Sequence, residues 1–541
     1  MASFRFQNES TYKSYLEQGK EEEFDRLFDE AVGKVKREEL GKRHGLFIGG
    51  KEVFAGEELV EKSPIDGTLI GTFQKGTREH ADQAIEAAKA AFSDWSETDY
   101  KERVKIMQNA AELFRKHKFE IAAILSIENG KSRYESVGEV DEAIDFLNYY
   151  SLEMLRNKGF VRKTRIGASS KQVSAGFQGA PGNEERITLA LKPYGVFGVI
   201  APFNFPVSIS TGMSTGALIT GNTVVFKPSS TDNMTMLTGL KIYQMFREAG
   251  IPEGAFNYIT GPGSEVGDEL VVHRDVNGIV FTGSRDTGMA MMKKALELGL
   301  QKTFIVEMGG KNPAIVSKKA DINDAVDGIA SAAFGFDGQK CSACSRVYVH
   351  EAIKEEFVSK LIDKMRSFKI GDPLKKDVYM GPLISGKALD KYRASIEEAK
   401  RSGKVLYGGR EVNTGLGGAY VEPTLIEVDQ SNRLMHEELF VPILALGTFK
   451  NFDEALRKAN DVEFGLTAGL YSKNGSEIKE FKKRIQAGVV YINRRTSATT
   501  GAIVGMHAFG GWKGSGLTGK GTGSRHYLPQ FMREQSQAVV K

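Results

Sequence analysis

The feature of this 541-residue chain that most limits its fold is a series of apolar segments spaced by about one helix each. From residue 195 onward these segments have the composition of buried strands, and they are "GVFGVIAP", "TVVFKP", "AFNYITG", "GIVFTG" and "TFIVEMG". Strands that alternate with helices form βαβ units and a parallel sheet. The spacing therefore predicts a doubly wound, nucleotide-binding α/β domain.

A second α/β pattern follows Glu307. The strand-like segments "PAIVS", "RVYVH" and "GVVYINR" are accompanied by a helix that leads into a turn with two cysteines and by a long helix from Ala352. The two cysteines are thus expected on a helix-to-strand loop at a domain junction, where clefts are common.

The first 160 residues predict mainly helices. Apolar residues at helical spacing among charged ones predict an amphipathic helix over 24–35 that packs on the main body, and "LFIGGKEV" predicts a short hairpin. Further helices are expected over Glu79–Trp95, over Lys101–Lys116 and around "DEAIDFLNYYSLEML". The helix after "KPSS" is expected to begin near the Ser-Thr-Asp run at 230–232, because these residues favour N-cap positions.

Charge and composition exclude several classes of protein. The net charge is only +4 and the charged residues interleave, so we expect no nucleic-acid partner. Residues 193–226 contain no charged side chain, but two prolines after residue 200 and five glycines favour two buried strands around a short helix over a membrane span. Two cysteines suit a reducing compartment, and "MASFRFQNES" has no secretory signal, so a cytoplasmic location is expected.

The two cysteines, Cys341 and Cys344 in "GFDGQKCSACSR", allow three interpretations. A structural zinc site needs four ligands, and the nearest downstream histidine, His350, has the wrong spacing. A redox pair begins a helix after a strand, whereas this pair leaves a helix and enters a strand. In the third interpretation one cysteine is a nucleophile, which requires an oxyanion site and a base that activates water. No metal is expected.

Two residues are candidates for those roles. Glu307 ends a predicted strand before a glycine turn, a position from which a carboxylate projects into a cleft, although a solvated loop acid is the alternative. Asn204 stands in "APFNFP" between rigid apolar neighbours, where its amide could donate to a developing oxyanion, although asparagine is also a common turn former.

Taken in order, "APFNFP", "VVFKPSS", "FTGSRDTG", "VEMGGKNP", "GQKCSACSR", "EELFVP", "FGLTAGLYS" and "FGGWKGSG" resemble the aldehyde dehydrogenase superfamily from about residue 45 onward. The resemblance implies an α/β fold with a Rossmann-type cofactor domain, an α/β catalytic domain and a small oligomerisation flap. The cofactor domain, with the N-terminal helices, is expected over 1–157 and 189–306, and the catalytic domain over 307–515. The flap and tail are expected over 158–188 and 516–541, and the chain is expected to form a homo-oligomer.

The resemblance also implies the catalytic roles. Cys341 attacks the aldehyde carbon as a thiolate, and the Asn204 amide with the Cys341 backbone N–H stabilises the oxyanion. Hydride then leaves to the nicotinamide, and Glu307 activates the water that hydrolyses the thioester. Lys340 is expected to lower the pKa of the thiol, and Cys344 is the bystander.

The cofactor, NAD or NADP, is expected at residues that match the family's motifs. Lys227 reaches the adenosine ribose, Ser284 opens a helix whose N-terminus faces the pyrophosphate, and Glu438 and Phe440 position the nicotinamide riboside. Many NAD-specific relatives carry a glutamate at the position of Ser230, so its absence predicts that NADP is usable. The complete expected set is Ile200, Ala201, Pro202, Phe203, Lys227, Ser229, Ser230, Gly263, Phe281, Gly283, Ser284, Glu438 and Phe440.

Four stretches, "FQNE", "DEAIDFLNYYS", "GQKCSACSR" and "TGAIVG", resemble the branch of the family that oxidises L-glutamate γ-semialdehyde, the open form of 1-pyrroline-5-carboxylate. In that branch a cation and backbone donors hold the substrate α-carboxylate and aromatic rings hold its methylenes. Succinic and 2-oxoglutaric semialdehydes are the alternatives. The residues implied are Glu142, Phe205, Lys340, Ser342, Gly501, Ala502 and Phe509.

Overall fold

The apolar segments from residue 195 onward form the predicted parallel sheet. The computed structural model describes residues 6–166, 185–495 and 503–540. Five strands run parallel, and the predicted hairpin extends one edge of the sheet in antiparallel pairing. In spatial order they are β12 (Thr303–Met308), β11 (Val276–Gly283), β8 (Val196–Ile200), β9 (Thr223–Lys227), β10 (Phe256–Tyr258), β2 (Leu46–Ile48) and β3 (Lys51–Val53).

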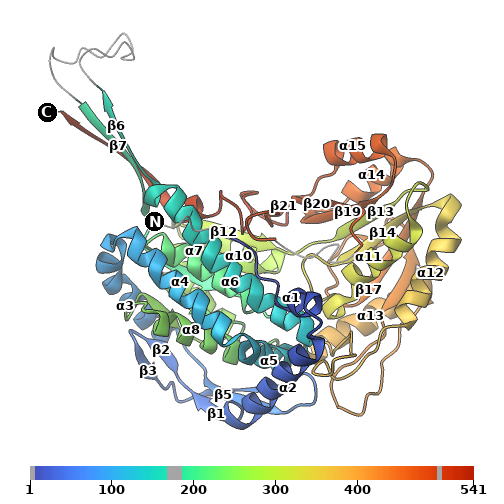
Figure 1. Ribbon diagram of the computed structural model, residues 1–541, viewed down its shortest axis with the longest axis horizontal. Coiled ribbons are helices and arrows are strands. Elements are labelled where there is room, and N and C mark those ends of the chain that lie inside the picture. Colours follow the sequence, from blue (N-terminus) through green and yellow to red (C-terminus); the bar gives the residue numbers. More distant parts are fainter. Residues whose placement is uncertain (1–5, 167–184, 496–502, 541) are drawn as a thin grey trace.

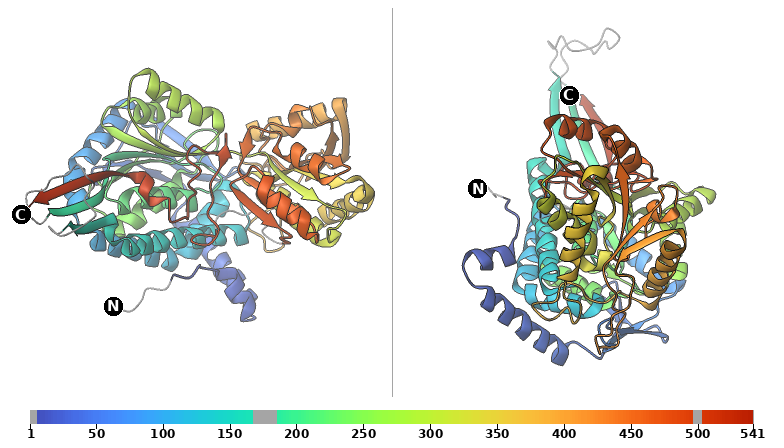
Figure 2. Two further views of the ribbon diagram at one scale, coloured as in Figure 1. Left: turned by 90° about the horizontal axis from the view of Figure 1, so that it is seen from above. Right: turned by 90° about the vertical axis from the view of Figure 1, so that its right-hand side faces the viewer.

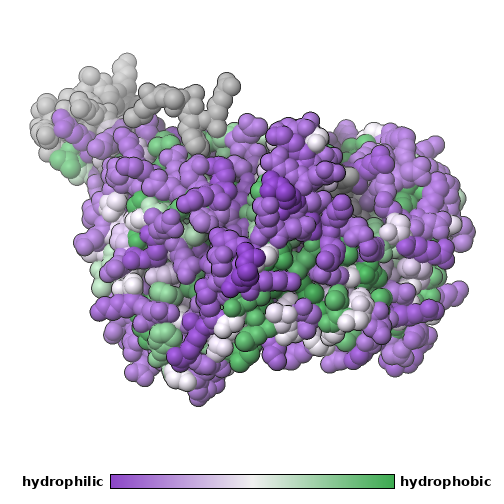
Figure 3. Space-filling model, turned by 60° about the horizontal axis from the view of Figure 1, so that its bottom comes forward, coloured by the Kyte–Doolittle hydropathy of each residue, from purple (hydrophilic) through white to green (hydrophobic). Residues whose placement is uncertain are grey.

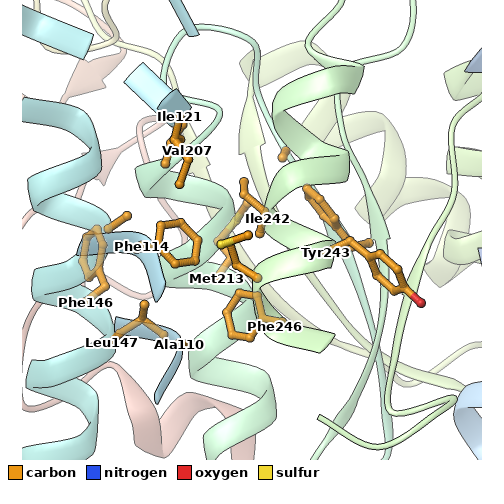
Figure 4. Close-up of a cluster of buried hydrophobic side chains, with 14 of the residues drawn as sticks. Ala110, Phe114, Ile121, Phe146, Leu147, Val207, Met213, Ile242, Tyr243 and Phe246 are labelled. Carbon is orange, nitrogen blue, oxygen red and sulfur yellow. The ribbon is translucent and has the colours of Figure 1, made fainter. Parts of the chain in front are cut away.

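Helices cover this sheet. Phe114, Phe146, Met213 and Phe246, which come from four different helices, meet in the buried cluster that Figure 4 shows. The helices of this half are α3 (Arg78–Glu97), α4 (Tyr100–Lys116), α5 (Lys118–Asn129), α6 (Arg133–Arg156), α7 (Ser208–Ile219), α8 (Met236–Ala249), α9 (Asp268–Val272) and α10 (Arg285–Glu297). Helix α6 is buried on nearly all sides, including several of its acidic residues.

The segment without charged residues folds as predicted into β8, α7 and β9, with the two strands paired in parallel. Its lack of charge follows from burial, since strands inside a parallel sheet contact helices on both faces. Within residues 6–166, 185–495 and 503–540, no helix has the length and apolar character needed to cross a membrane.

The second α/β pattern forms a second lobe (Figures 1 and 2). Its sheet is parallel except for one antiparallel edge strand, β15. In spatial order the strands are β15 (Gly403–Tyr407), β16 (Thr424–Val428), β17 (Ile443–Phe449), β14 (Cys344–His350), β13 (Asn312–Val316), β19 (Thr467–Tyr471) and β20 (Val489–Ile492). The helices are α11 (Ile322–Phe334), α12 (Lys354–Arg366), α13 (Gly386–Ser402), α14 (Phe452–Asn460) and α15 (Gly475–Arg484).

A third sheet projects from the body of the first lobe (Figure 1). It consists of β6 (Val161–Ile166), β7 (Glu185–Pro193) and β22 (Met532–Val540), with β7 in the middle and antiparallel to both neighbours. Residues 167–184, in the middle of the predicted flap, lie outside the described residues. The small strands elsewhere are β1 (Lys42–His44), β4 (Glu58–Lys62), β5 (Leu69–Gln74), β18 (Phe464–Gly465) and β21 (Trp512–Lys513).

The N-terminal segment folds into α1 (Thr11–Glu17) and α2 (Glu21–Glu38). Phe24, Phe28 and Val35 of α2 are buried against the first lobe, which confirms the predicted amphipathic helix.

On the face of the molecule in Figure 3, hydrophilic residues cover most of the surface and apolar residues gather toward its middle.

The predicted start of α8 is wrong. The helix begins at Met236, and the residues at 230–232 belong to the loop that precedes it. Two buried carboxyl groups cap the helix instead, since Glu61 accepts a hydrogen bond from the Met236 N–H (3.1 Å) and Glu128 accepts from the Leu237 and Thr238 N–H groups (2.7 and 3.1 Å). Acceptors for the first N–H groups stabilise the start of a helix, so carboxyl groups distant in sequence set this boundary.

Candidate active site

The segment with both cysteines lies, as predicted, between a helix and a strand. After α11 the backbone turns through Phe336 and Asp337, both in the left-handed region, and Cys344 then begins β14. The side-chain amide of Asn312, at the start of β13, donates to the carbonyls of Cys341 (2.7 Å) and Ala343 (2.9 Å). These bonds hold the cysteine loop against the end of the second sheet.

Cys341 faces Glu307, the residue before the last one of β12 in the first lobe. The distance from Cys341 Sγ to Glu307 Oε1 is 3.9 Å, within reach of a weak S–H hydrogen bond. Burial, followed by the negative charge of Glu142, raises the pKa of Glu307 to about 8. Burial and the Glu307 and Glu438 carboxylates raise the pKa of the Cys341 thiol. The structure therefore joins a protonated thiol to a carboxyl group that can exchange a proton near neutral pH.

Lys340 does not lower the pKa of the thiol, contrary to the expectation from sequence. Its ammonium group forms an ion pair with Glu135, in the first turn of α6. Burial and the nearby carboxylates raise the pKa of the Cys341 thiol, so the expected lowering is not found. Lys340 adjoins Cys341 in the chain, but its ammonium group is held by a residue of the other lobe.

Asn204 contacts the cysteine loop directly. It follows β8 in a turn, is 3% exposed, and its Nδ2 donates to the Gln339 carbonyl (3.1 Å), two residues before Cys341. One N–H of the amide is used in this bond, and an amide nitrogen carries two. The second N–H is the one that can donate to a group bound at the cysteine.

Cys344 has a different environment from Cys341. It is 1% exposed, its Sγ donates to the Arg346 carbonyl (3.4 Å), and burial raises the pKa of its thiol to about 12. Cys344 packs in the core of the second lobe, whereas Cys341 lines a cavity between the lobes. Only Cys341 combines a nearby carboxyl group with access to that cavity.

Most of the expected substrate residues border the same cavity. Its polar wall includes Glu142 and Ser342 beside Cys341 and Glu307, and its apolar wall includes aromatic rings. Lys340 is not part of the lining, and Gly501 and Ala502 lie outside the described residues. The predicted residues that line the cavity are Glu142, Phe205, Phe281, Glu307, Cys341, Ser342 and Phe509.

The expected cofactor residues cluster at the carboxyl ends of the parallel strands of the first sheet. Such an edge is where open α/β sheets bind nucleotides. Ser284 follows β11 and caps α10 by accepting from the Thr287 N–H (3.2 Å), so the start of this helix faces the edge. The residues found there are Ile200 at the end of β8 with Ala201, Pro202 and Phe203 after it, Lys227 at the end of β9 with Ser229 and Ser230 after it, and Phe281 near the end of β11 with Gly283 at its end.

Lys227 has the character of a group that awaits an anionic or hydroxyl-bearing ligand. Its ammonium is buried, and among the residues that the structure describes it donates only to the Pro228 carbonyl, at 3.3 Å; burial lowers its pKa to about 8. The Ser230 hydroxyl donates to the same carbonyl (2.9 Å). A buried ammonium with so little hydrogen bonding, at the sheet edge where α/β folds bind nucleotides, fits a dinucleotide.

Glu438 and Phe440 connect the two lobes near the reactive residues. Glu438 accepts from the Gly310 N–H (2.8 Å) in the turn after Glu307, and burial raises its pKa to about 7. The ring of Phe440 meets that of Phe203 edge to face, with centroids 5.8 Å apart. Gly263 starts the short helix 263–267 after β10, and in the described part of the chain no atom beyond its own neighbours and helix lies within 4 Å of the position that a Cβ would take there.

Sequence reasoning missed several residues of the site. Part of the predicted tail, including Leu517 and Tyr527, lines the cavity, and nothing in a single sequence relates it to Cys341. Asn312 stood within the motif "VEMGGKNP", which was the available signal. Lys131 and Glu139 form a fully buried ion pair that contacts the Asn204 carbonyl, and nothing in a single sequence distinguishes these two residues from exposed charges.

Comparison with known proteins agrees with this arrangement. Residues 54–536 match the model of the aldehyde dehydrogenase family. The 1-pyrroline-5-carboxylate dehydrogenase of Geobacillus sp. (strain WCH70) is 38% identical over 517 residues, which cover 94% of this chain and 95% of that protein. The 1-pyrroline-5-carboxylate dehydrogenase 1 of Halalkalibacterium halodurans is 37% identical over 519 residues, covering 94% and 95%.

Solved structures give the same result. The crystal structure of 1-pyrroline-5-carboxylate dehydrogenase from Thermus with bound NAD superposes with a TM-score of 0.89 at 34% identity and covers both chains fully. Proline utilization A from Bdellovibrio bacteriovorus gives 0.89 at 33% identity, and this chain spans 54% of that longer protein. The predicted family and fold class are therefore confirmed, and the chain belongs to the aldehyde dehydrogenase family.

Proposed function

We propose that this protein oxidises L-glutamate γ-semialdehyde to L-glutamate, with NAD or NADP as the hydride acceptor. The observation that carries the proposal is the cavity in which Cys341 Sγ lies 3.9 Å from Glu307 Oε1, bordered by Phe205 and Phe509. Relatives that match this chain over nearly its full length carry the name 1-pyrroline-5-carboxylate dehydrogenase, and a structural neighbour holds NAD.

The reaction begins with proton transfer. Burial raises the pKa of the Cys341 thiol, so the sulfur holds its proton before the reaction. Burial also raises the pKa of Glu307, which makes its carboxylate a stronger proton acceptor. The thiol proton therefore passes to the Glu307 carboxylate as the sulfur attacks the aldehyde carbon. The aldehyde oxygen becomes an oxyanion that accepts hydrogen bonds from the Asn204 amide and the Cys341 N–H. A bound nicotinamide supplies the acceptor for the hydride that leaves this carbon.

Hydrolysis of the resulting thioester returns the enzyme to its starting state. Glu307, after release of the proton it took from the thiol, accepts a proton from water as the water attacks the thioester carbon. The carbon–sulfur bond breaks and the carboxylic acid leaves, and the proton held by Glu307 passes to the departing thiolate, which restores the thiol. A carboxyl group with a pKa near 8 serves both steps, since its two protonation states are close in free energy near neutral pH.

Binding of the substrate α-carboxylate distinguishes this branch of the family from the others. Ser342 borders the cavity and can donate its hydroxyl to that group, and Gly501 and Ala502 are the proposed backbone donors. Lys340 can contribute only by exchanging its ion pair with Glu135 for the substrate carboxylate. Phe205 and Phe509 supply the apolar walls for the methylenes.

A steady-state assay with both dinucleotides tests the proposal. Glutamate γ-semialdehyde is expected to give a higher kcat/KM than succinic or 2-oxoglutaric semialdehyde, with saturable NAD and measurable turnover with NADP. A higher kcat/KM for succinic or for 2-oxoglutaric semialdehyde would refute the assignment of substrate. A product that forms only with coenzyme A would refute hydrolysis of the thioester.

We also propose that the protein is a homo-oligomer. The projecting sheet of β6, β7 and β22 has β22 and β6 at its edges, and edge strands offer unpaired backbone groups to another chain. Val161 and Val539, on these two strands, are exposed apolar residues. Light scattering coupled to gel filtration is expected to give a mass of at least twice 59.4 kDa, and a monomeric mass would refute the proposal.

A further inference from the structure

The turn between α5 and α6 holds the backbone on either side of the oxyanion amide. The side-chain Nδ2 of Asn129 donates to the Phe203 carbonyl (3.4 Å), and Lys131 Nζ donates to the Asn204 carbonyl (2.7 Å). Gly130 lies between them in the left-handed region, φ +79°, and a Cβ there would lie 2.8 Å from Pro382. Two successive carbonyls of the turn that carries Asn204 are thus bound by one short segment.

Lys131 is in turn held by Glu139, a buried residue of α6. The ammonium and the carboxylate form an ion pair with both side chains 0% exposed. Glu139 Oε1 also accepts from the Val207 and Ser208 N–H groups, at 2.7 and 3.2 Å, at the start of α7. The ion pair therefore binds the segment that carries Asn204 at its carbonyl on one side and at two N–H groups on the other.

Aromatic rings complete the enclosure of the ammonium. Lys131 Nζ lies 3.7 Å from the ring centroid of Phe205, a wall of the cavity, and 4.6 Å from that of Phe336, in the turn before Cys341. One cation thus contacts the Asn204 segment, the cavity wall and the cysteine loop at once. A buried ion pair is a poor source of stability, because the loss of hydration offsets most of the attraction. Its location suggests a role in geometry.

We propose that Lys131 and Glu139 are positioning residues, which hold the Asn204 segment so that its side-chain amide stays beside Cys341 as the oxyanion forms. The inference deepens the proposed function and rests on the thioester chemistry at Cys341. It predicts that loss of the ion pair slows reactions of the thiol that pass through an oxyanion, and spares reactions of the same thiol that do not.

Two reagents separate these cases. p-Nitrophenyl acetate acylates a thiol through a tetrahedral oxyanion and releases p-nitrophenolate, whereas iodoacetamide alkylates it by displacement of iodide without any oxyanion. Both rates are measured on the full-length protein with Cys344→Ala in the background, so that modification reports Cys341 alone. Mass spectrometry of the modified protein identifies the site.

Lys131→Met is expected to slow acylation about 10- to 100-fold, since a misplaced donor or reacting group has effects of this order, while alkylation is unchanged. Lys118→Met is the matched control. Lys118 Nζ forms a similarly buried ion pair with Asp141 of α6 (2.6 Å) but touches neither the Asn204 segment nor the cysteine loop. Its loss is expected to lower the Tm with both rates unchanged.

Glu139→Gln provides a second variant that keeps an oxygen for the Val207 and Ser208 N–H groups and removes the charge. It is expected to give the same separation of rates in a smaller degree, which keeps the test valid if Lys131→Met does not fold. Equal loss of acylation and alkylation, or an unchanged ratio of the two rates, would overturn the inference. A wild-type protein that is acylated at Cys341 yet oxidises no semialdehyde would overturn the proposed function and leave this inference standing.

Discussion

The raised pKa of Glu307 predicts the pH dependence of thioester hydrolysis. A pKa of about 8, against an ordinary value of 4.5, means that ionisation of this buried carboxyl costs about 5 kcal/mol more than in water. The general base acts only when ionised, so its active fraction is about one tenth at pH 7 and about nine tenths at pH 9. Hydrolysis is therefore expected to rise about tenfold over this interval and then level off.

The assay is a single turnover with enzyme in excess over aldehyde. Acid quenching at intervals, followed by mass spectrometry of the protein thioester, gives the hydrolysis rate at each pH. Glu142→Gln removes the negative charge that contributes to the raised pKa, so its midpoint is expected at lower pH than the wild type's. Glu307→Gln leaves only hydroxide attack, whose rate rises with pH without a plateau.

A wild-type profile that follows Glu307→Gln across the range, or a midpoint near 4.5, would refute this account.

The raised pKa of Glu307 also has a consequence for the stability of the folded protein. A carboxyl group whose pKa is higher in the folded state contributes its full stability below about pH 4.5 and loses it as pH rises to about 8. Glu307→Gln is thus expected to raise the Tm relative to wild type at pH 9 and to leave it nearly unchanged at pH 4.

Three further predictions concern other parts of the molecule. Cys341→Ala should reduce turnover by more than about 10⁴-fold with dinucleotide binding retained, whereas Cys344→Ala should keep most activity, and equal losses would contradict the assignment. Ser230→Glu should lower kcat/KM for NADP by more than about tenfold relative to NAD, because a carboxylate repels a 2′-phosphate; equal effects on both cofactors would argue against a role in selection. Glu128→Ala should destabilise the protein in urea by about 1–3 kcal/mol for each α8 N–H left unpaired, whereas Glu61→Gln, which keeps an acceptor, should cost far less.

The first sheet could be predicted from the sequence because its strands are buried on both faces. Parallel strands covered by helices appear as continuous apolar segments, and the glycine- and proline-rich turns after them mark the edge where ligands bind. The location of Cys341 followed from the same pattern, since α11 and β14 were both recognisable and the cysteines stand between them. Motif order then related Glu307 and Asn204 to that loop.

The errors arose where a charged group has a partner distant in sequence. The start of α8 is set by the carboxyl groups of Glu61 and Glu128, which accept hydrogen bonds from its first N–H groups. The residues at 230–232 favour N-cap positions but do not cap the helix, and no local pattern in the sequence reveals the distant acceptors. Lys340 is adjacent to Cys341 in the chain, yet its ammonium is held by Glu135, 205 residues away. Local propensity is overridden whenever tertiary contacts satisfy the same backbone or charged groups.

The contrast between the two cysteines shows what makes one of them a nucleophile here. Burial raises the pKa of both thiols, so neither is ionised in advance, and acidity alone does not separate them. Cys341 differs because a carboxyl group lies 3.9 Å from its sulfur and both face a cavity. The thiolate is then formed only as the substrate carbon arrives and the proton moves to Glu307. Such a site keeps its sulfur protonated between turnovers, since the thiolate, and not the thiol, reacts with oxidants and electrophiles.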